Sequence, residues 1–286
     1  MNVKNKVVLD ATLQRWAQLF ASEHFSYTEL VALEKRIAAQ PTLPHSQVPK
    51  VIHQSWITSR MDEQMARWVR SWQVFHPGWL HILWTDAMLR TLFDHRFPAG
   101  SSVRELFEQY PLSVQKCDLA RLVLLQRYGG LYADADFEAK AAFDDALSAS
   151  QCQAFVVESP HKPAEHFQNS LMASRQNHTF LSALAEKMRR RWDEVQNGTR
   201  PFGVLGTTGP HVVDDVMVSL GYRWDKKRVH WGVTPISWNE SSVCQLGARE
   251  YYAGTYARHH LRNSWNDGVF QAVHKRTGPR LSGWLH

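Results

Sequence analysis

The sequence predicts an α/β protein in which helices cover both faces of a central sheet. Two observations lead to this class. Apolar runs of strand length alternate along the chain with longer segments whose apolar residues recur at helical spacing. Turn residues such as Gly, Pro and Asp separate these segments. The length of 286 residues, with 44% hydrophobic residues, provides a core for one large domain or two small ones.

Residues 6–39 are predicted to form two helices. In the first, apolar residues between Leu9 and Phe20 recur at helical spacing. Ser26 and Glu29 have the spacing of a capping box, which would begin the second helix. We therefore expect an N-terminal helical hairpin. It could pack on the main domain, lie on a membrane surface or form an oligomer contact.

A linker is predicted over residues 40–49, because this segment carries three prolines and no apolar periodicity. We therefore assign residues 1–47 to the N-terminal helical segment and residues 48–286 to the main domain. The main domain is expected to begin with an apolar strand over residues 50–57.

Further strands and helices follow in alternation. A helix with Met65 and Trp72 on its apolar face comes after the first strand, and residues 79–84 form the next strand. Thr85 can cap another short helix, as can the aspartate that follows it. Residues 153–158 are another strand candidate. Beyond residue 200 the many Gly, Trp and turn residues predict short strands and loops.

A helix over residues 113–128 carries a long apolar side and ends at Gly129 and Gly130. A strand over residues 131–137 is expected to follow it. Side chains alternate between the two faces of a strand. The polar face of this strand comprises Tyr132, Asp134, Asp136 and Glu138.

Asp134 and Asp136 form a DxD motif at the end of this predicted strand. Two neighbouring carboxylates repel each other, so a divalent cation with oxygen ligands is the simplest partner for them. Ligand sites in α/β sheets also tend to lie at the carboxyl ends of strands. The alternative is a pair of solvated acids at a strand end.

The charge and cysteine content exclude several classes of protein. The net charge is +6, but the basic residues are scattered and form no recognised module, so we expect no nucleic-acid partner. The three cysteines are odd in number and have no CxxC spacing. This argues against a disulfide framework or a structural zinc site and favours a reducing compartment.

The N-terminal residues lack the apolar core of a secretory signal, since Asp10, Gln14 and Arg15 interrupt it. No run of residues approaches the length of a membrane span. The sequence therefore favours a cytoplasmic protein, with peripheral contact to a membrane as a further expectation.

Several separate motifs occur in one order and resemble a known family. They are IHQSWI (52–57), SWQVFHPGW (71–79), ILWTD (82–86), CDLARLVLLQRYGGLYADADFE (117–138), TGP (208–210) and HHLRNSW (259–265). Together they resemble the DxD glycosyltransferases of family 32 and, more distantly, the glucosyltransferase domains of clostridial toxins. The resemblance covers residues 48–266. It implies the GT-A fold, a nucleotide-sugar-binding α/β domain with a mixed sheet flanked by helices.

The resemblance also implies an activity. The protein would move a hexose from a UDP-linked sugar or GDP-mannose to a hydroxyl of a glycan, a lipid-linked glycan or a protein, and would retain the anomeric configuration. A divalent cation, Mn²⁺ or Mg²⁺, would stabilise the charge that develops on the departing diphosphate. The sequence presents no obvious protein nucleophile, so we favour attack on the donor from the leaving-group side.

The resemblance assigns catalytic roles residue by residue. Asp136 would contact the metal directly, and Asp134 would hold the ribose or a metal-bound water. Asp118 and Arg121 lie on one face of the predicted helix and would reach the donor sugar. His260 would be a further metal ligand or a phosphate donor, whereas its neighbour His259 is expected to pack in the core.

Other residues are implied in substrate binding. Trp56 would stack on the base, and Ser264 with Trp265 would fold over the diphosphate, Ser264 also as a metal ligand. The remaining positions, at the donor sugar or on the acceptor side, are Tyr132, Asn169, Thr208 and Gly209. His53 and Gln54 are predicted to be structural.

Two rival functions are weaker on the sequence. Phosphotransferases with an aspartate nucleophile also carry DxD, but there the motif lies near the start of the domain and is followed by Thr or Val. Here Phe137 follows a motif in the middle of the chain. The second rival is a catalytically inactive carbohydrate-binding or scaffold protein derived from the same fold.

Overall fold

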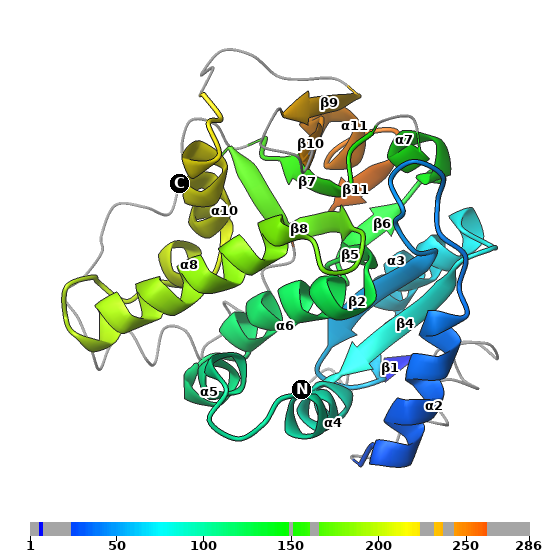
Figure 1. Ribbon diagram of the computed structural model, residues 1–286. Helices are drawn as coiled ribbons and strands as arrows, with labels where there is room; N and C mark the ends of the chain where they lie inside the picture. Colours follow the sequence, from blue (N-terminus) through cyan, green and yellow to red (C-terminus); the bar gives the residue numbers. More distant parts are fainter. Residues whose placement is uncertain are drawn as a thin grey trace, which may run out of the picture.

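The computed structural model describes residues 6–7, 24–148, 151–160, 166–223, 232–236 and 243–261. A seven-stranded sheet runs through the centre of the molecule in the order β4-β2-β5-β8-β7-β10-β9 (Figure 1). Its strands are β4 (Leu80–Thr85), β2 (Val51–Trp56), β5 (Gly130–Ala133), β8 (Phe167–Ser174), β7 (Ala154–Glu158), β10 (Val243–Leu246) and β9 (Val233–Ile236).

The sheet is mixed. β2 runs parallel to both β4 and β5, and β10 runs parallel to β7. β8 lies antiparallel between β5 and β7, and β9 is antiparallel to β10. The strands predicted over residues 50–57, 79–84 and 153–158 are therefore confirmed within one or two residues as β2, β4 and β7. The predicted α/β class with a mixed sheet is confirmed as well.

Helices and a small second sheet cover the two faces of the main sheet (Figure 1). One hydrophobic core joins the sheet to α2 (Tyr27–Ala38), α4 (Asp86–Arg96), α5 (Ser102–Gln109), α6 (Ser113–Tyr128), α8 (Thr179–Gln196) and α10 (Pro210–Ser219). The core on the opposite face includes residues of α3 (Glu63–Phe75), α7 (Asp144–Ser148), α11 (Ala248–Tyr251) and the antiparallel pair β6 (Phe137–Ala139) and β11 (Ala257–His259).

The alternation of side chains along the strands explains the two cores. In β2, Val51 packs into the first core and Ile52 into the second. In β5, Tyr132 packs into the first core and Leu131 into the second. Strands buried on both faces are rich in apolar residues, and such residues mark β2 and β4 in the sequence, although β2 also buries His53 and Gln54.

The N-terminal prediction is confirmed in part. Ser26 caps α2, and the side chain of Glu29 accepts a hydrogen bond from the Ser26 N–H at 2.7 Å, which completes the capping box. α2 buries its apolar side in the same core as α4 and α6. The apolar stripe of the first predicted helix lies outside the described residues. That helix does not begin at residue 6, because β1 (Lys6–Val7) pairs as a strand with β3 (Met61–Asp62).

Two long helices lie where the sequence indicates none. α8 has 18 residues, and α10 lies in the region beyond residue 200 that was expected to hold only short strands and loops. α10 begins with Pro210 in its first turn, a position where the missing N–H has no intrahelical partner to lose. A four-residue helix, α9 (Val204–Thr207), precedes it. The expected short strands are also present as β9, β10 and β11.

The strand predicted over residues 131–137 is wrong, because a turn divides it. β5 ends at Ala133, and the N–H of Phe137 donates to the carbonyl oxygen of Asp134 at 2.9 Å. From Phe137 the chain pairs with β11 rather than with the main sheet. The change of pairing partner requires the turn. Asp134 and Asp136 therefore lie on a turn between two sheets, and the predicted four-residue polar face does not form.

Gly129 and Gly130 connect α6 to β5, and both require the absence of a side chain. Their φ angles are +65° and +102°, which non-glycine residues rarely adopt. A Cβ on Gly129 would lie 2.7 Å from Cδ of Pro49, and a Cβ on Gly130 would overlap the carbonyl oxygen of Val51. The two glycines therefore allow β5 to lie directly against β2.

The cysteine count argued against a disulfide framework, but Cys152 and Cys244 form a disulfide across 92 residues of sequence. Cys244 lies in β10 beside Phe155 of the parallel strand β7, and Cys152 lies just before β7. The pairing brings the two Cα atoms within 5.6 Å. Counting and local spacing cannot detect a pair that only strand pairing brings together. Cys117 is a free thiol.

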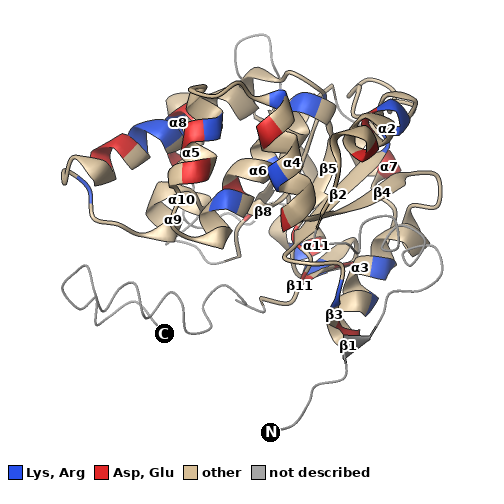
Figure 2. Cartoon of the chain, turned by 90° about the horizontal axis from the view of Figure 1, so that it is seen from below, with Lys and Arg blue, Asp and Glu red and all other residues tan. Residues whose placement is uncertain are grey.

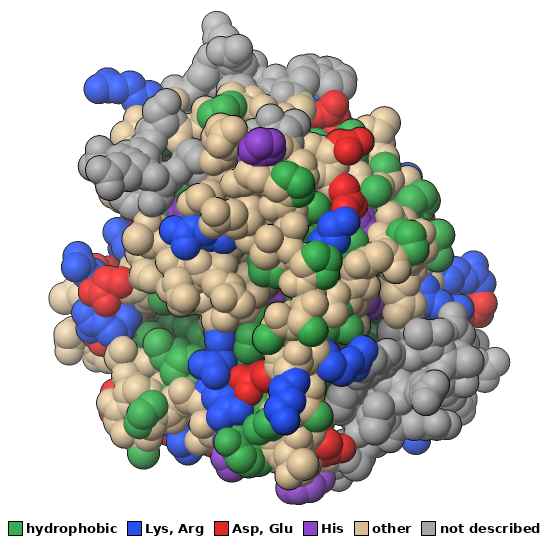
Figure 3. Space-filling model, turned by 45° about the vertical axis from the view of Figure 1, so that its right-hand side comes forward, with side chains coloured by type: hydrophobic (Ala, Val, Ile, Leu, Met, Phe, Trp, Pro, Cys, Tyr) green, Lys and Arg blue, Asp and Glu red, His purple; other side chains and the backbone are tan. Residues whose placement is uncertain are grey.

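Charged residues are interleaved on the surface. Along α8, basic and acidic side chains alternate and form ion pairs such as Arg189 with Glu186 at 2.9 Å (Figure 2). Lys and Arg also lie beside Asp and Glu, with hydrophobic side chains between them, on the face shown in Figure 3. Among the described helices, none combines the length and apolar character needed to cross a membrane.

Replacing Gly130 with alanine is expected to destabilise the fold by about 2 kcal/mol or more. The new Cβ would overlap the Val51 carbonyl at a φ that alanine avoids. Urea unfolding of the purified proteins measures the difference. Gly78→Ala is the matched control, because no atom lies within 4 Å of its Cβ position and its φ is not in the left-handed region. Equal stability of the two variants would contradict this explanation.

The disulfide predicts a thiol count. Unfolded without reductant, the protein should expose one reactive thiol, that of Cys117, and three after reduction. Reduction should also lower the free energy of unfolding by about 3 kcal/mol, because the bond closes a long loop in the unfolded chain. Cys117→Ser should keep this response to reductant, and Cys152→Ser should lose it. Three reactive thiols in the unreduced protein would exclude the bond.

Candidate active site

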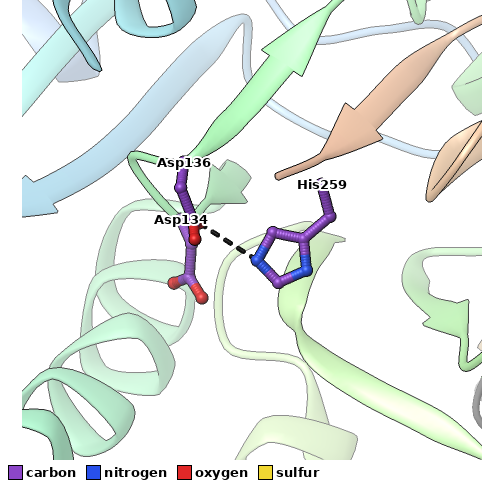
Figure 4. Close-up of side chains that lie close together, drawn as sticks. All are labelled: Asp134, Asp136 and His259. Carbon is purple, nitrogen blue, oxygen red and sulfur yellow. Dashed lines mark hydrogen bonds and ion pairs between the residues drawn. The ribbon is translucent and has the colours of Figure 1, made fainter. Parts of the chain in front are cut away.

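The DxD turn, between β5 and β6, lies next to the end of β11. Ligand atoms of Asp134, Asp136 and His259 all lie within 4.8 Å of one another (Figure 4). His259 is the last residue of β11, and the pairing of β11 with β6 places it opposite Phe137. The second sheet therefore brings together residues more than 120 positions apart in the sequence.

His259 is held in place on three sides. Its Nε2 lies 3.0 Å from Oδ1 of Asp136, and its Nδ1 lies 2.7 Å from the Tyr252 hydroxyl. Its ring stacks on Phe137 with the centroids 4.4 Å apart. A hydroxyl can both donate and accept a hydrogen bond, so Tyr252 can bond to either tautomer of the imidazole. Nε2 can therefore give its proton to Asp136 or offer its lone pair to a cation.

This donor set fits a divalent cation. Two carboxylates provide the hard oxygen ligands that Mg²⁺ and Mn²⁺ take. One imidazole is more typical of a transition-metal ion, so the set favours Mn²⁺ over Mg²⁺. Asp134, Asp136 and His259 would hold the ion, and His259 has in Tyr252 the outer partner that metal-binding histidines commonly have.

The metal role predicted for His260 does not match its position. Nε2 of His260 bonds to Oε2 of Glu138 at 3.0 Å, and its ring stacks on Trp68 with the centroids 3.9 Å apart. Consecutive residues of an extended chain point in opposite directions, so His259 and His260 cannot both face the DxD turn. His259, and not His260, reaches the carboxylates. The predicted packing of His259 is also present, since its ring stacks on Phe137, while the ring of His260 stacks on Trp68.

A buried arginine connects the DxD turn to α6. Nη2 of Arg121 lies 3.0 Å from Oδ1 of Asp134 and 3.0 Å from Oδ1 of Asp118. Its Nη1 donates to the carbonyl oxygen of Asn169 at 2.7 Å. The side chains of Arg121 and Asp118 are each only 5% exposed, so water screens this pair little, whereas the side chain of Asp134 is 28% exposed. The predicted helix face with Asp118 and Arg121 is thus confirmed as part of one ionic network.

Asn169 and Thr208 complete this network from β8 and the end of α9. Asn169 donates to Oδ1 of Asp118 at 3.0 Å and to the carbonyl oxygen of Thr208 at 3.3 Å. The Thr208 hydroxyl donates to Oδ2 of Asp118 at 2.7 Å. Gly209 follows directly and caps α10. The structure therefore gathers Asp118, Arg121, Asp134, Asn169 and Thr208, all predicted from the sequence, into one site.

The pKa of Asp118 is raised to about 6. Burial is the largest cause, because the protein interior disfavours the charged form. Arg121 and the hydrogen bonds from Thr208 and Asn169 oppose the shift by stabilising the carboxylate. Asp118 is therefore mostly ionised at neutral pH and becomes protonated in mildly acidic solution.

The other predicted binding residues lie around this network. Tyr132 is buried, bonds through its hydroxyl to Ser55 at 2.8 Å, and lies under the Arg121 guanidinium. Its ring therefore packs against the Arg121 guanidinium and helps to hold that side chain in place. Trp56 ends β2 and is partly buried against the cluster around Met65. Ser264 and Trp265 lie outside the described residues.

Sequence reasoning assigned no site role to His259, Tyr252 or Gln54, all of which contact the DxD turn or its histidine. The adjacent residues His259 and His260 were the sequence signal that a histidine could lie near the DxD turn. Choosing between them requires the register of β11 on β6, which the sequence does not reveal. Tyr252 is one of several aromatic residues in its segment, and nothing local distinguishes it.

Comparisons with known proteins agree with this geometry. A family model described as "Glycosyltransferase sugar-binding region containing DXD motif" matches residues 62–153. The chain is 33% identical over 137 residues to inositol phosphoceramide mannosyltransferase 1 of Schizosaccharomyces pombe, a match that covers 47% of this chain and 40% of the relative. The matched region thus spans less than half of that relative. The resemblance to the DxD glycosyltransferases is confirmed.

Two solved structures are also similar. The PaToxG glycosyltransferase aligns with a TM-score of 0.47 at 19% identity and covers 66% of this chain and 76% of that one. The catalytic domain of alpha-toxin from Clostridium novyi aligns with a TM-score of 0.45 at 8% identity, covering 72% and 80%.

The raised pKa of Asp118 predicts a pH-dependent stability. Its folded pKa of about 6 exceeds the ordinary value of 3.8, so the folded state holds the proton more tightly than the unfolded chain. The resulting stabilisation is complete below pH 3.8 and is lost as pH rises through 6. The free energy of unfolding, relative to that of Asp118→Asn, should therefore fall by about 2 kcal/mol across this range.

Urea titrations at a series of pH values measure this difference. Asp145→Asn is the control, because Asp145 is exposed on α7 and should leave the pH dependence as in the unsubstituted protein. Parallel curves for the unsubstituted protein and Asp118→Asn would show that the pKa is not raised.

Proposed function

We propose that the protein is a metal-dependent glycosyltransferase that moves a hexose from a nucleoside-diphosphate sugar to a hydroxyl acceptor with retention of configuration. One observation carries the proposal. The cation-binding group of Asp134, Asp136 and His259 is joined through Arg121 to a buried polar network around Asp118. A nucleotide-sugar transferase needs these two parts side by side, one for a diphosphate and one for a sugar.

The first part would hold the diphosphate. A bound divalent cation supplies Lewis-acid stabilisation of the charge that develops on the departing β-phosphate. Asp136 and His259 would hold the ion directly. Asp134 is already paired with Arg121 at 3.0 Å, so it would contribute a second oxygen to the ion or hold the ribose. Trp56, at the end of the neighbouring strand, is the candidate for stacking on the base.

The second part would hold the sugar. Asp118 offers carboxylate oxygens as acceptors to sugar hydroxyls, Asn169 orients that carboxylate, and Arg121 provides a positive charge beside it. Asp118 already accepts hydrogen bonds from Asn169 and Thr208. A carboxylate held in this way is better suited to orient hydroxyls than to act as a covalent nucleophile. We therefore favour front-side attack, in which the acceptor hydroxyl loses its proton to the departing phosphate.

The donor and acceptor follow from the relatives. The S. pombe relative is named for transfer of mannose to a phosphoinositol lipid. This makes GDP-mannose the first donor to test, with UDP-hexoses second, and a lipid-linked hydroxyl the first acceptor. Glycan and protein hydroxyls remain as further acceptors.

The cellular location remains a proposal. We propose that the protein works in the cytoplasm, or against a membrane where a lipid acceptor would be reached. The disulfide between Cys152 and Cys244 is more typical of an oxidising compartment, so it opposes the cytoplasmic alternative. Fractionation of cells that express the tagged protein distinguishes soluble from membrane-associated protein, and the redox state of Cys152 and Cys244 in those cells distinguishes a reducing from an oxidising compartment.

A donor-hydrolysis screen tests the proposed activity. With Mn²⁺ present, at least one of the common nucleotide sugars should be hydrolysed. Asp136→Asn and His259→Gln should each lower the rate on the order of 100-fold, because each removes an ionic or imidazole ligand. His260→Gln is the comparison variant, and it should change the Mn²⁺ requirement little, since His260 bonds to Glu138.

Two results would overturn the proposal. Undiminished turnover by Asp136→Asn would exclude the metal site. Absence of hydrolysis together with absence of Mn²⁺-dependent binding of UDP and GDP would indicate the inactive carbohydrate-binding or scaffold protein instead.

A further inference from the structure

The strand that carries the DxD motif is held at both ends by two consecutive residues of β2. β5 has only four residues. At its start, Nε2 of His53 bonds to the carbonyl oxygen of Gly129 at 2.9 Å. At its end, Nε2 of Gln54 donates to the carbonyl oxygen of Asp134 at 3.2 Å. Neighbouring residues of a strand point to opposite faces, so the two bonds approach β5 from opposite sides of the sheet.

The hydrogen bond from Gln54 reaches the backbone carbonyl oxygen of Asp134, which also belongs to the DxD turn. The carbonyl oxygen of Asp134 also accepts from the N–H of Phe137 at 2.9 Å, and that bond closes the DxD turn. Gln54 thus donates to the same carbonyl oxygen of Asp134 that accepts the hydrogen bond closing the turn. The carboxylate of the same residue pairs with Arg121, so a shift of the Asp134 backbone would move both the turn and the ion pair.

His81 of β4 fixes the orientation of Gln54. Nε2 of His81 lies 2.8 Å from Oε1 of Gln54. Because the amide nitrogen of Gln54 donates to Asp134, its oxygen can only accept, and His81 must carry its proton on Nε2. The hydrogen bonds therefore run in one direction, from His81 through Gln54 to the Asp134 carbonyl.

Neither histidine changes its charge near neutral pH. Burial lowers the pKa of His53 to about 4 and that of His81 to about 3. The indole N–H of Trp84 donates to Nδ1 of His53 at 3.0 Å, which places the His53 proton on Nε2 toward Gly129. The hydrogen bonds from His53 to Gly129 and from His81 to Gln54 therefore keep the same donor and acceptor near neutral pH.

Gln54 is buried on β2 and acts through the backbone of Asp134. We propose that Gln54, oriented by His81, is a positioning residue that holds the DxD turn in the geometry in which Asp134, Asp136 and His259 bind a divalent cation. The inference rests on the metal site of the proposed function. It assigns to Gln54 of β2 and His81 of β4 a part in metal affinity.

The test measures Mn²⁺ binding without donor, by the loss of the free-ion signal in electron paramagnetic resonance. Gln54→Met keeps the length of the side chain and removes both hydrogen bonds. It should raise the Kd for Mn²⁺ about 10-fold, the effect typical of an outer partner of a metal site. His81→Phe leaves Gln54 in place without its donor and should shift the Kd in the same direction.

The matched control is Gln245→Met. Gln245 is a buried strand glutamine in β10, which is separated from β5 by β8 and β7. It should bind Mn²⁺ as the unsubstituted protein does. A positioning role also predicts that saturating Mn²⁺ restores the turnover of Gln54→Met. Because an ion that binds the folded state would rescue a folding defect as well, circular dichroism without Mn²⁺ should show that the variant is already folded.

The outcomes separate the two proposals. If the unsubstituted protein binds no Mn²⁺, the metal site itself is wrong. If it binds Mn²⁺ and Gln54→Met binds equally well, the positioning role is wrong while the metal site stands. Should Gln54→Met fail to fold, His81→Phe decides alone: an unchanged Kd in that variant overturns the inference.

Discussion

The site depends on one buried cation between two carboxylates. Arg121 lies between Asp118 of its own helix and Asp134 of the DxD turn, with 3.0 Å to each. Burying a guanidinium is costly unless its charge and its N–H groups find partners. Here α6, β8 and the DxD turn together provide partners for its charge and its two terminal nitrogens. The interaction therefore ties the geometry of the three elements to one another, and an error in the placement of any one of them would leave a buried charge unpaired.

The second constraint is that the DxD turn belongs to two sheets. The chain leaves the main sheet at Asp134 and joins the small sheet at Phe137. Asp134 therefore faces the network of α6, while Asp136 faces the histidine at the end of β11. Two acids that are nearly equivalent in sequence acquire different partners. This division of roles follows from the change of sheet, since a continuous strand would have placed both acids on one face.

The sequence predicted much of the fold because several elements carry local signals. β2 and β4 carry apolar residues that are buried on both faces of the sheet, and α6 has a continuous apolar side ended by Gly129. Local reasoning also found the DxD pair, whereas Asp118 and Arg121 were assigned through the resemblance to the DxD glycosyltransferases. Local reasoning failed for features that depend on which strands pair with each other. The turn at Asp134, the choice of His259 over its neighbour and the Cys152–Cys244 bond all follow from strand partners that are far away in the sequence. Helix α10 was missed for a different reason: the segment just before it, residues 206–209, is rich in Gly and Thr and is typical of a loop.

The covalent bond between β7 and β10 has a topological consequence for the sugar site. Asn169 and Thr208 lie between Cys152 and Cys244 in the sequence, whereas Asp118 and Arg121 lie before the first cysteine. The site is thus assembled from a part inside a covalent ring and a part outside it. A single cut of the backbone within the ring would not release a fragment, because both cut ends remain joined through the sulfur atoms. Such a nicked chain would migrate as two pieces only after reduction, and before it the two halves of the site would still be tethered to each other.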